Sequence, residues 1–108
     1  MRAGGAVIAH DTAGVHLLEG RRELAVLWDL RVTPDARRSG VGAALFAEAG
    51  RWARERHCTH LKVETQNVNV PACRFYAAQG CTLGVINRFA YPALAEEVQL
   101  LWYRQLAP

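Results

Sequence analysis

Lysine is almost absent from this 108-residue sequence, and long apolar runs are missing. Of its 13 basic residues only Lys62 is a lysine, and the arginines are scattered rather than gathered in one run, unlike a nucleic-acid-binding tail. No apolar run approaches the length that crosses a bilayer, and no signal-peptide pattern opens the chain. We therefore expect a cytoplasmic protein without a membrane partner.

Several motifs of catalytic and metal-binding proteins are also missing. The three cysteines have no framework spacing and form no C-x-x-C pair, which favours reduced thiols. His57-Cys58-Thr59-His60 supplies too few ligands for a tetrahedral zinc site, so we expect no metal. The sequence has neither the Gly-Lys-Ser/Thr of a nucleoside triphosphatase loop nor a G-x-G-x-x-G dinucleotide motif.

The composition that remains is that of one globular domain over residues 1–108. Hydrophobic residues make up 51% of the chain and charged residues 21%, with a net charge of +3. Arginine suits bidentate recognition of phosphate better than lysine does. Charge alone is compatible with either a nucleic acid or a small phosphorylated ligand.

Apolar periodicity predicts a sheet with two helices packed on it, an α+β fold. One helix starts at Val41 and ends near His57, and the other spans Pro71 to Gln79, with Gly80 just beyond its end. Pro92 to Glu97 is expected to form a loop or single turn. The predicted strands cover residues 4–9, 14–19, 24–32, 60–66, 82–86 and 98–103.

The stretch RRSGVG, from Arg37 to Gly42, joins a predicted strand to a predicted helix. A helix N-terminus leaves about four backbone N–H groups without internal partners and carries roughly half a positive charge. Gly40 and Gly42 leave that backbone bare, and Arg37 and Arg38 can add charge-assisted bonds. The stretch fits a diphosphate cradle, although a tight glycine-rich turn explains the glycines equally well.

Arg37-x-x-Gly40-x-Gly42 after a strand resembles the central coenzyme A motif of the GNAT superfamily of N-acetyltransferases. A second block, from Asn69 to Cys81, resembles the superfamily pattern N-x-x-A-x-x-hydrophobic-Y-x-x-x-G, except that Cys81 replaces the usual aromatic residue. The resemblance covers about residues 24–106, and the stretch VETQNVNVPACRFY is most similar to streptothricin-type acetyltransferases. It implies a mixed, mostly antiparallel sheet with splayed central strands and two main helices.

The resemblance also implies an acetyl-CoA site, with no metal. The main chain of residues 30–32 would bind pantetheine, and the N–H of Val32 would polarise the thioester carbonyl. Bulk apolar burial explains the side chains of Leu30 and Val32 equally well, and Asn69 is also a helix cap. The residues expected to contact the cofactor are Leu30, Arg31, Val32, Arg37, Arg38, Ser39, Gly40, Val41, Gly42, Ala43, Asn69, Ala72 and Phe75.

Three residues are candidates for proton transfer. Tyr76 matches the tyrosine of the second block and would protonate the leaving thiolate. Asp29 and Glu64 are the candidate bases. Each carboxylate could instead form an ion pair, with Arg31 or Lys62, or simply lie on a solvated face of its strand. Glu96 and Glu97, in the predicted loop, would either attract a cationic amine or be ordinary surface charges. Cys73 has no role as a nucleophile, because direct transfer forms no acyl-enzyme.

The resemblance predicts transfer of an acetyl group from acetyl-CoA to a primary amine of a small molecule, by direct attack in a ternary complex. The alternatives are a catalytically impaired CoA-binding module and a small nucleic-acid binder. Relative to the superfamily the chain is short at its N-terminus, where a strand and helices usually form one wall of the acceptor pocket. Because such a gap exposes apolar surface, we expect a homodimer.

Overall fold

The computed structural model describes residues 4–12, 14–33 and 39–106. The chain divides into two compact units, one within residues 1–61 and 105–108 and the other within residues 62–104. Hydrogen bonding orders the strands β1-β2-β3-β5-β4 in one five-stranded sheet, and two α-helices and one short 3-10 helix complete the described elements. The predicted α+β fold is therefore confirmed, and both α-helices lie where the apolar periodicity put them.

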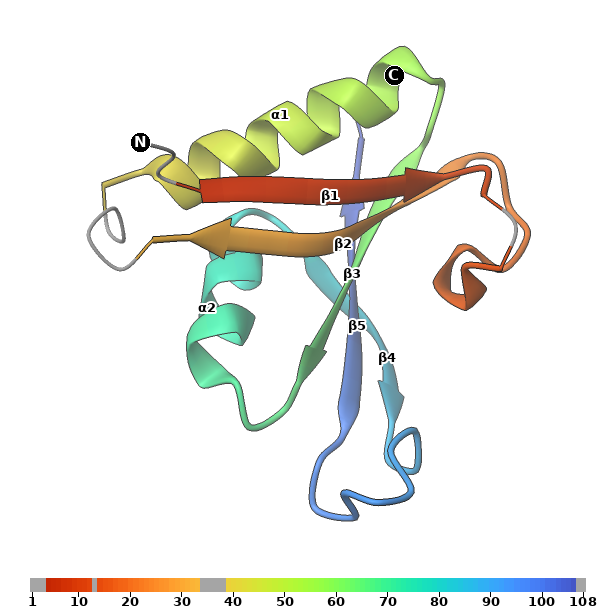
Figure 1. Ribbon diagram of the computed structural model, residues 1–108, viewed down its shortest axis with the longest axis vertical. Helices are drawn as coiled ribbons and strands as arrows, with labels where there is room; N and C mark the ends of the chain where they lie inside the picture. Colours follow the sequence, from red (N-terminus) through yellow and green to blue (C-terminus); the bar gives the residue numbers. More distant parts are fainter. Residues whose placement is uncertain (1–3, 13, 34–38, 107–108) are drawn as a thin grey trace. The chain divides into compact units, whose positions relative to one another are not determined.

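The first unit is built on an antiparallel strand pair, β1 (Gly4–His10) and β2 (Leu24–Val32), with helix α1 (Val41–Glu55) packed on both strands, as Figure 1 shows. The apolar run that predicted β2 supplies the centre of this unit, because residues 24–27 are all buried. From α1, Phe46, Ala49 and Ala53 are buried. Spacings of three and four residues place these three side chains on one face of the helix.

Strand β2 contains a bulge at Trp28. Val7 of β1 pairs with Asp29, and the next residue, Ile8, pairs with Leu27, so Trp28 is the extra residue of β2. Its side chain is 59% exposed. A bulge bends its strand and increases the local twist, and bulges are frequent beside active sites. The structure thus has a bulge in the strand that precedes the RRSGVG stretch from Arg37 to Gly42, here called the glycine loop.

The strand predicted over residues 14–19 is wrong. This segment contains a single 3-10 turn, η1 (His16–Leu18), in which the N–H of Leu18 donates to Val15 O at 3.1 Å and that of Glu19 to His16 O at 3.0 Å. Glu19 has a φ of 54°, in the left-handed region, which ends any extended conformation there. Within this segment only Leu18 is buried, so its apolar residues contribute one side chain to the core and do not form a strand.

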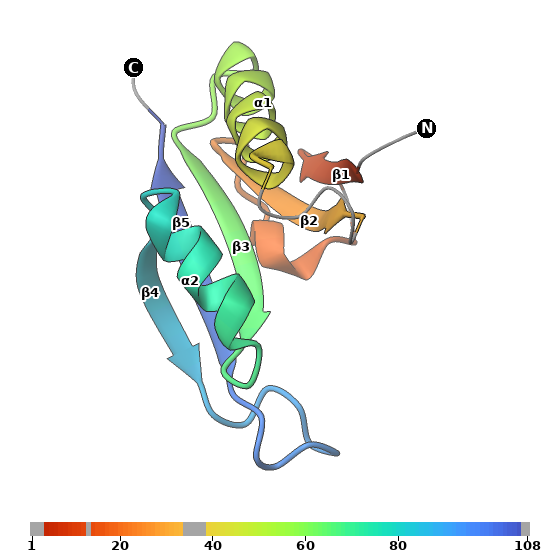
Figure 2. The ribbon, with the colours of Figure 1, turned by 90° about the vertical axis from the view of Figure 1, so that its left-hand side faces the viewer.

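The second unit contains most of β3 (His60–Gln66) and of β5 (Gln99–Gln105), together with α2 (Val70–Ala78) and β4 (Thr82–Asn87). β4 pairs antiparallel with β5, and Figure 2 shows α2 along one face of this strand group. Inside the unit the indole N–H of Trp102 donates to Thr65 Oγ1 at 2.9 Å. This hydrogen bond gives a partner to the buried indole N–H and to the buried hydroxyl group. No helix among the described residues is long and apolar enough to cross a membrane.

The last strand starts one residue later than predicted. Val98 lies before β5 because its N–H donates to the side-chain Oδ1 of Asn67 at 2.8 Å, and its carbonyl accepts from the Asn67 N–H at 3.0 Å. This reciprocal pair joins the end of the β4–β5 loop to the residue that follows β3.

Candidate functional site

The glycine loop is the most distinctive feature of the first unit. Gly40 precedes α1 with φ 86° and ψ 1°, a left-handed conformation that glycine adopts without strain. A Cβ added at Gly40 would meet no atom of the described part of the chain within 4 Å, so nothing there crowds the backbone. The first hydrogen bond of the helix runs from Ala44 N–H to Gly40 O, at 3.0 Å.

That geometry leaves donors at the start of α1. Within the described residues the N–H groups of Val41, Gly42 and Ala43 make no hydrogen bond, and no side chain caps the helix. The first turn also carries no acidic residue. Three backbone donors and the positive end of the helix dipole therefore face outward at one point, an arrangement that suits an anion. Arg37 and Arg38, predicted to add charge here, lie outside the described residues.

The end of β2 lies against β1 and leaves an open hollow. Leu30 pairs with Ala6, Arg31 with Gly5, and Val32 with Gly4. A Cβ on Gly4 would lie 2.3 Å from the carbonyl oxygen of Arg31, so this close pairing requires glycine. Over the same strand ends lies a hollow of about 380 Å³, lined by residues 4–7, 29 and 31–33.

Asp29, one of the two candidate bases, lines this hollow as half of an ion pair. Its Oδ2 accepts from Arg31 Nε at 2.8 Å, and the two side chains are 39% and 82% exposed. The ion pair considered from the sequence is therefore present. At such exposure it adds little to stability, because solvent screens the two charges.

In the second unit, α2 carries the residues of the second sequence block. Asn69 is the N-cap of the helix, and its Oδ1 accepts from the N–H of Ala72 at 3.2 Å, so the capping alternative is confirmed. Ala72 and Phe75 are half-buried, and the ring of Phe75 meets that of Tyr76 edge-on with centroids 5.1 Å apart. Tyr76 is only 8% exposed, which limits contact between its phenol and solvent.

Glu64, the other candidate base, lies on β3 beside a tyrosine that the sequence did not single out. The phenol of Tyr91, in the β4–β5 loop, donates to Glu64 Oε2 and accepts from Gln66 Nε2 at 3.2 Å. Glu64 and Gln66 are two residues apart on one strand, so their side chains share a face. Lys62, the alternative partner considered for Glu64, is buried with its Nζ 5.7 Å from the centre of the Tyr103 ring.

The sequence profile of the Acetyltransferase (GNAT) family matches residues 3–81. This range includes the glycine loop, Glu64 of β3 and the second sequence block, from Asn69 to Cys81. The chain belongs to this family. The resemblance that the two sequence blocks indicated is thereby confirmed.

The relatives of this GNAT chain point in the same direction. It is 38% identical over 81 residues to streptothricin acetyltransferase A of Bacillus subtilis (strain 168), covering 73% of this chain and 47% of that protein. It is 36% identical over 103 residues to a streptothricin acetyltransferase of Escherichia coli, covering 92% and 59%. A structure from Bacillus anthracis str. Ames, in complex with acetyl coenzyme A, has a TM-score of 0.84 at 30% identity, covering 97% and 57%. The GNAT chain thus spans about half the length of these curated relatives.

Two cysteines of the GNAT chain are held as protonated thiols. Burial raises the pKa of Cys58, whose Sγ lies 3.9 Å from Arg22 O, and burial raises the pKa of Cys81 to about 11. A protonated thiol is a weak nucleophile and a weak metal ligand. Within residues 4–12, 14–33 and 39–106 no group of three or more His, Cys, Asp or Glu side chains is placed to hold a metal ion.

Tyr91 is the residue of the GNAT chain that sequence reasoning missed. It lies 27 residues from Glu64, so no local spacing links the two side chains. The available signal was weaker: an aromatic residue directly before the predicted loop, and two hydrogen-bonding side chains, Glu64 and Gln66, at alternate positions of a predicted strand.

Proposed function

We propose that this GNAT chain transfers an acetyl group from acetyl-CoA to a primary amine of a small molecule, by direct attack in a ternary complex. The proposal depends above all on the start of α1, where three N–H groups have no partner among the described residues and lie beside Gly40. The relatives support it, since two are named streptothricin acetyltransferases and one structure holds acetyl coenzyme A. We further propose that residues 1–108 act as one cytoplasmic domain.

The residues present fit the cofactor. The N–H groups of Val41, Gly42 and Ala43, with Ser39 and Gly40 before them, would hold the diphosphate, assisted by Arg37 and Arg38. The main chain of Leu30, Arg31 and Val32 would bind the pantetheine amides. Bound acetyl-CoA supplies the activated acetyl group, and the N–H of Val32 would stabilise negative charge on its carbonyl oxygen. From α2, Asn69, Ala72 and Phe75 would complete the cofactor contacts.

Two proton transfers remain for side chains. An amine attacks only when neutral, so a carboxylate, Asp29 or Glu64, takes its proton. The departing thiolate needs a proton in return, which we assign to the phenol of Tyr76. An unperturbed phenol has a pKa of about 10 and can donate to a thiolate held close to it. Glu96 and Glu97, in the β4–β5 loop, would attract a cationic acceptor.

Calorimetry and a thiol-release assay together test this function. Acetyl-CoA should bind to the purified chain, and free thiol should appear with at least one member of a panel of aminoglycoside-like and β-lysine-bearing amines. Binding without turnover on any amine would favour the impaired CoA-binding module instead. Failure to bind acetyl-CoA, with salt-dependent binding to oligonucleotides, would favour the nucleic-acid binder.

We also propose that the chain forms a homodimer through β4. β4 pairs on one side with β5, and within the described residues no strand pairs with its other edge. Around this edge Ile86 is 62% exposed and Phe89 84% exposed, an apolar surface uncommon on a monomer. A second copy of β4, antiparallel about a two-fold axis, offers complementary backbone groups and the same apolar side chains.

The dimer should show in light scattering as a mass twice the 12.0 kDa of the chain at micromolar concentration. Ile86→Lys should return the mass to that of a monomer, because it places a charge in the apolar contact. Val7→Lys is the matched control: Val7 is 55% exposed on β1, and its replacement should leave the dimer intact. A monomeric wild-type chain would contradict the proposal.

A further inference from the structure

Glu64 has a defined orientation in the second unit, imposed by one neutral donor. The phenol of Tyr91 donates to Oε2, and Gln66 Nε2 in turn donates to the phenol oxygen. Within the described residues the side chain of Glu64 makes no other hydrogen bond, so Oε1 keeps its acceptor capacity. One oxygen of the carboxylate is thereby fixed, and the other is left to accept a proton.

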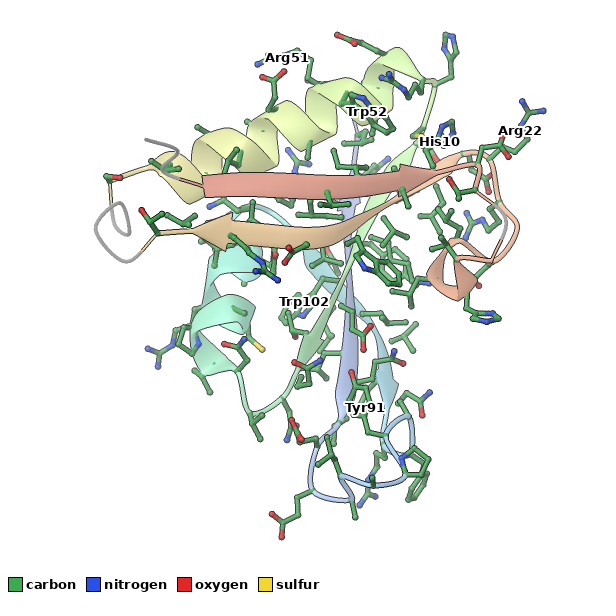
Figure 3. All side chains as sticks on the ribbon, viewed as in Figure 1. His10, Arg22, Arg51, Trp52, Tyr91 and Trp102 are labelled. Atoms are coloured by element: carbon green, nitrogen blue, oxygen red, sulfur yellow. The ribbon has the colours of Figure 1, made fainter. Side chains whose placement is uncertain are left out.

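Tyr91 can orient Glu64 because its own position is fixed by the loop. Its carbonyl accepts from Leu94 N–H at 2.9 Å, and Leu94 O accepts from Glu97 N–H at 2.9 Å, so two successive turns follow it. The far end of the loop is joined to β3 through Asn67 and Val98. Figure 3 labels Tyr91 near the loop that joins β4 to β5.

The phenol of Tyr91 is suited to donate a hydrogen bond rather than to lose its proton. Burial raises its pKa, the carboxylates of Glu64 and Glu97 raise it further, and the hydrogen bond from Gln66 acts in the opposite direction. A phenol whose pKa is raised stays protonated through neutral pH. It therefore remains a donor to Glu64 over the pH range in which an amine-acetylating enzyme works.

The two candidate bases differ in the charge of their partners. Asp29 is paired with the guanidinium of Arg31, so its negative charge is already balanced by a cation. Glu64 is held by the neutral phenol of Tyr91, so its negative charge remains available to an acceptor.

We propose that Tyr91 is a positioning residue that presents Glu64 Oε1 to the acceptor amine as the general base. The inference depends on the proposed acetyltransferase function and deepens it. The N–H proton of the attacking amine passes to Oε1 as the bond from nitrogen to the acetyl carbon forms. Oε2 keeps its hydrogen bond from Tyr91 throughout, and the leaving thiolate takes its proton from Tyr76.

A double-mutant cycle on turnover tests the assignment. Tyr91→Phe should lower kcat about tenfold with little change in KM for acetyl-CoA, because it removes one hydrogen bond to a charged group. Glu64→Gln should lower kcat about a hundredfold, within the usual range for losing a general base. On the Glu64→Gln background, Tyr91→Phe should have almost no further effect, since the group it positions is gone.

The matched control is Tyr103→Phe, which removes a half-buried phenol from β5 of the same unit and should leave kcat unchanged. Additive effects of Tyr91→Phe and Glu64→Gln, or an unchanged kcat in Tyr91→Phe, would overturn the positioning role while leaving the acetyltransferase assignment in place.

A measurement without turnover separates this inference from the proposed function. Ultraviolet titration of the tyrosines should show one phenol ionising at unusually high pH, lost in Tyr91→Phe and moved to lower pH in Glu64→Gln. Titration curves identical in wild type and Glu64→Gln would contradict the pair itself. The wild-type chain could bind acetyl-CoA and show the Tyr91–Glu64 pair in this titration, yet acetylate no amine. That result would contradict the proposed activity and, with it, the catalytic roles of Glu64 and Tyr91.

Discussion

Replacing Tyr76 by phenylalanine should lower kcat by about 10²–10³ while the dissociation constant of acetyl-CoA changes by less than about threefold. The substitution keeps the ring, and with it the edge-on contact to Phe75. It removes only the O–H that would protonate the departing thiolate. Steady-state release of free thiol gives kcat, and calorimetry on the same protein gives the affinity for acetyl-CoA.

The burial of Tyr76 calls for a stability control. Because its side chain is only 8% exposed, loss of the hydroxyl should cost about 1 kcal/mol of unfolding free energy. Denaturant unfolding of Tyr76→Phe should therefore show a small shift, with the variant still folded under the assay conditions. A kcat equal to that of the wild type would remove Tyr76 from the acid role. A parallel loss of acetyl-CoA binding would assign the phenol to the cofactor site.

The elements that the sequence predicted well are those whose signal is local. The run from Leu24 to Leu27 is apolar at every position, and all four residues are buried in β2. Asn69 lies three residues before Ala72, the spacing at which a side-chain oxygen meets a free N–H, and it caps α2 as expected. Gly40 stands at a helix start and has the positive φ that only glycine adopts readily.

The features that escaped prediction depend on pairing or on tertiary contacts. The segment around His16–Leu18 has the apolar residues of a strand, but it pairs with no strand among the described residues, and a local turn provides its backbone hydrogen bonds instead. The position of the bulge, at Trp28, is a property of the register between β1 and β2, which one strand alone does not encode. The hydrogen bond between Tyr91 and Glu64 joins two residues that are 27 positions apart in the sequence, and it depends on the fold of the β4–β5 loop.

The second large effect is expected at Gly40, where one added negative charge should abolish cofactor binding. Gly40→Asp places a carboxylate before the N–H groups of Val41 and Gly42, in the space in which a Cβ meets no atom within 4 Å. Its repulsion with a diphosphate a few ångströms away is about 4 kcal/mol at the effective dielectric of a protein surface. With partial screening, the dissociation constant of acetyl-CoA should still rise by at least about a hundredfold.

The matched variant is Gly40→Asn, which adds a side chain of the same size and no charge. Asparagine and aspartate tolerate the left-handed conformation of residue 40 about equally, so both variants should fold with similar stability. Gly40→Asn should therefore bind acetyl-CoA within about tenfold of the wild type, because it adds bulk without repulsion. If the two variants lost affinity equally, crowding rather than charge would decide binding. If neither lost affinity, the diphosphate would have to lie away from the start of α1.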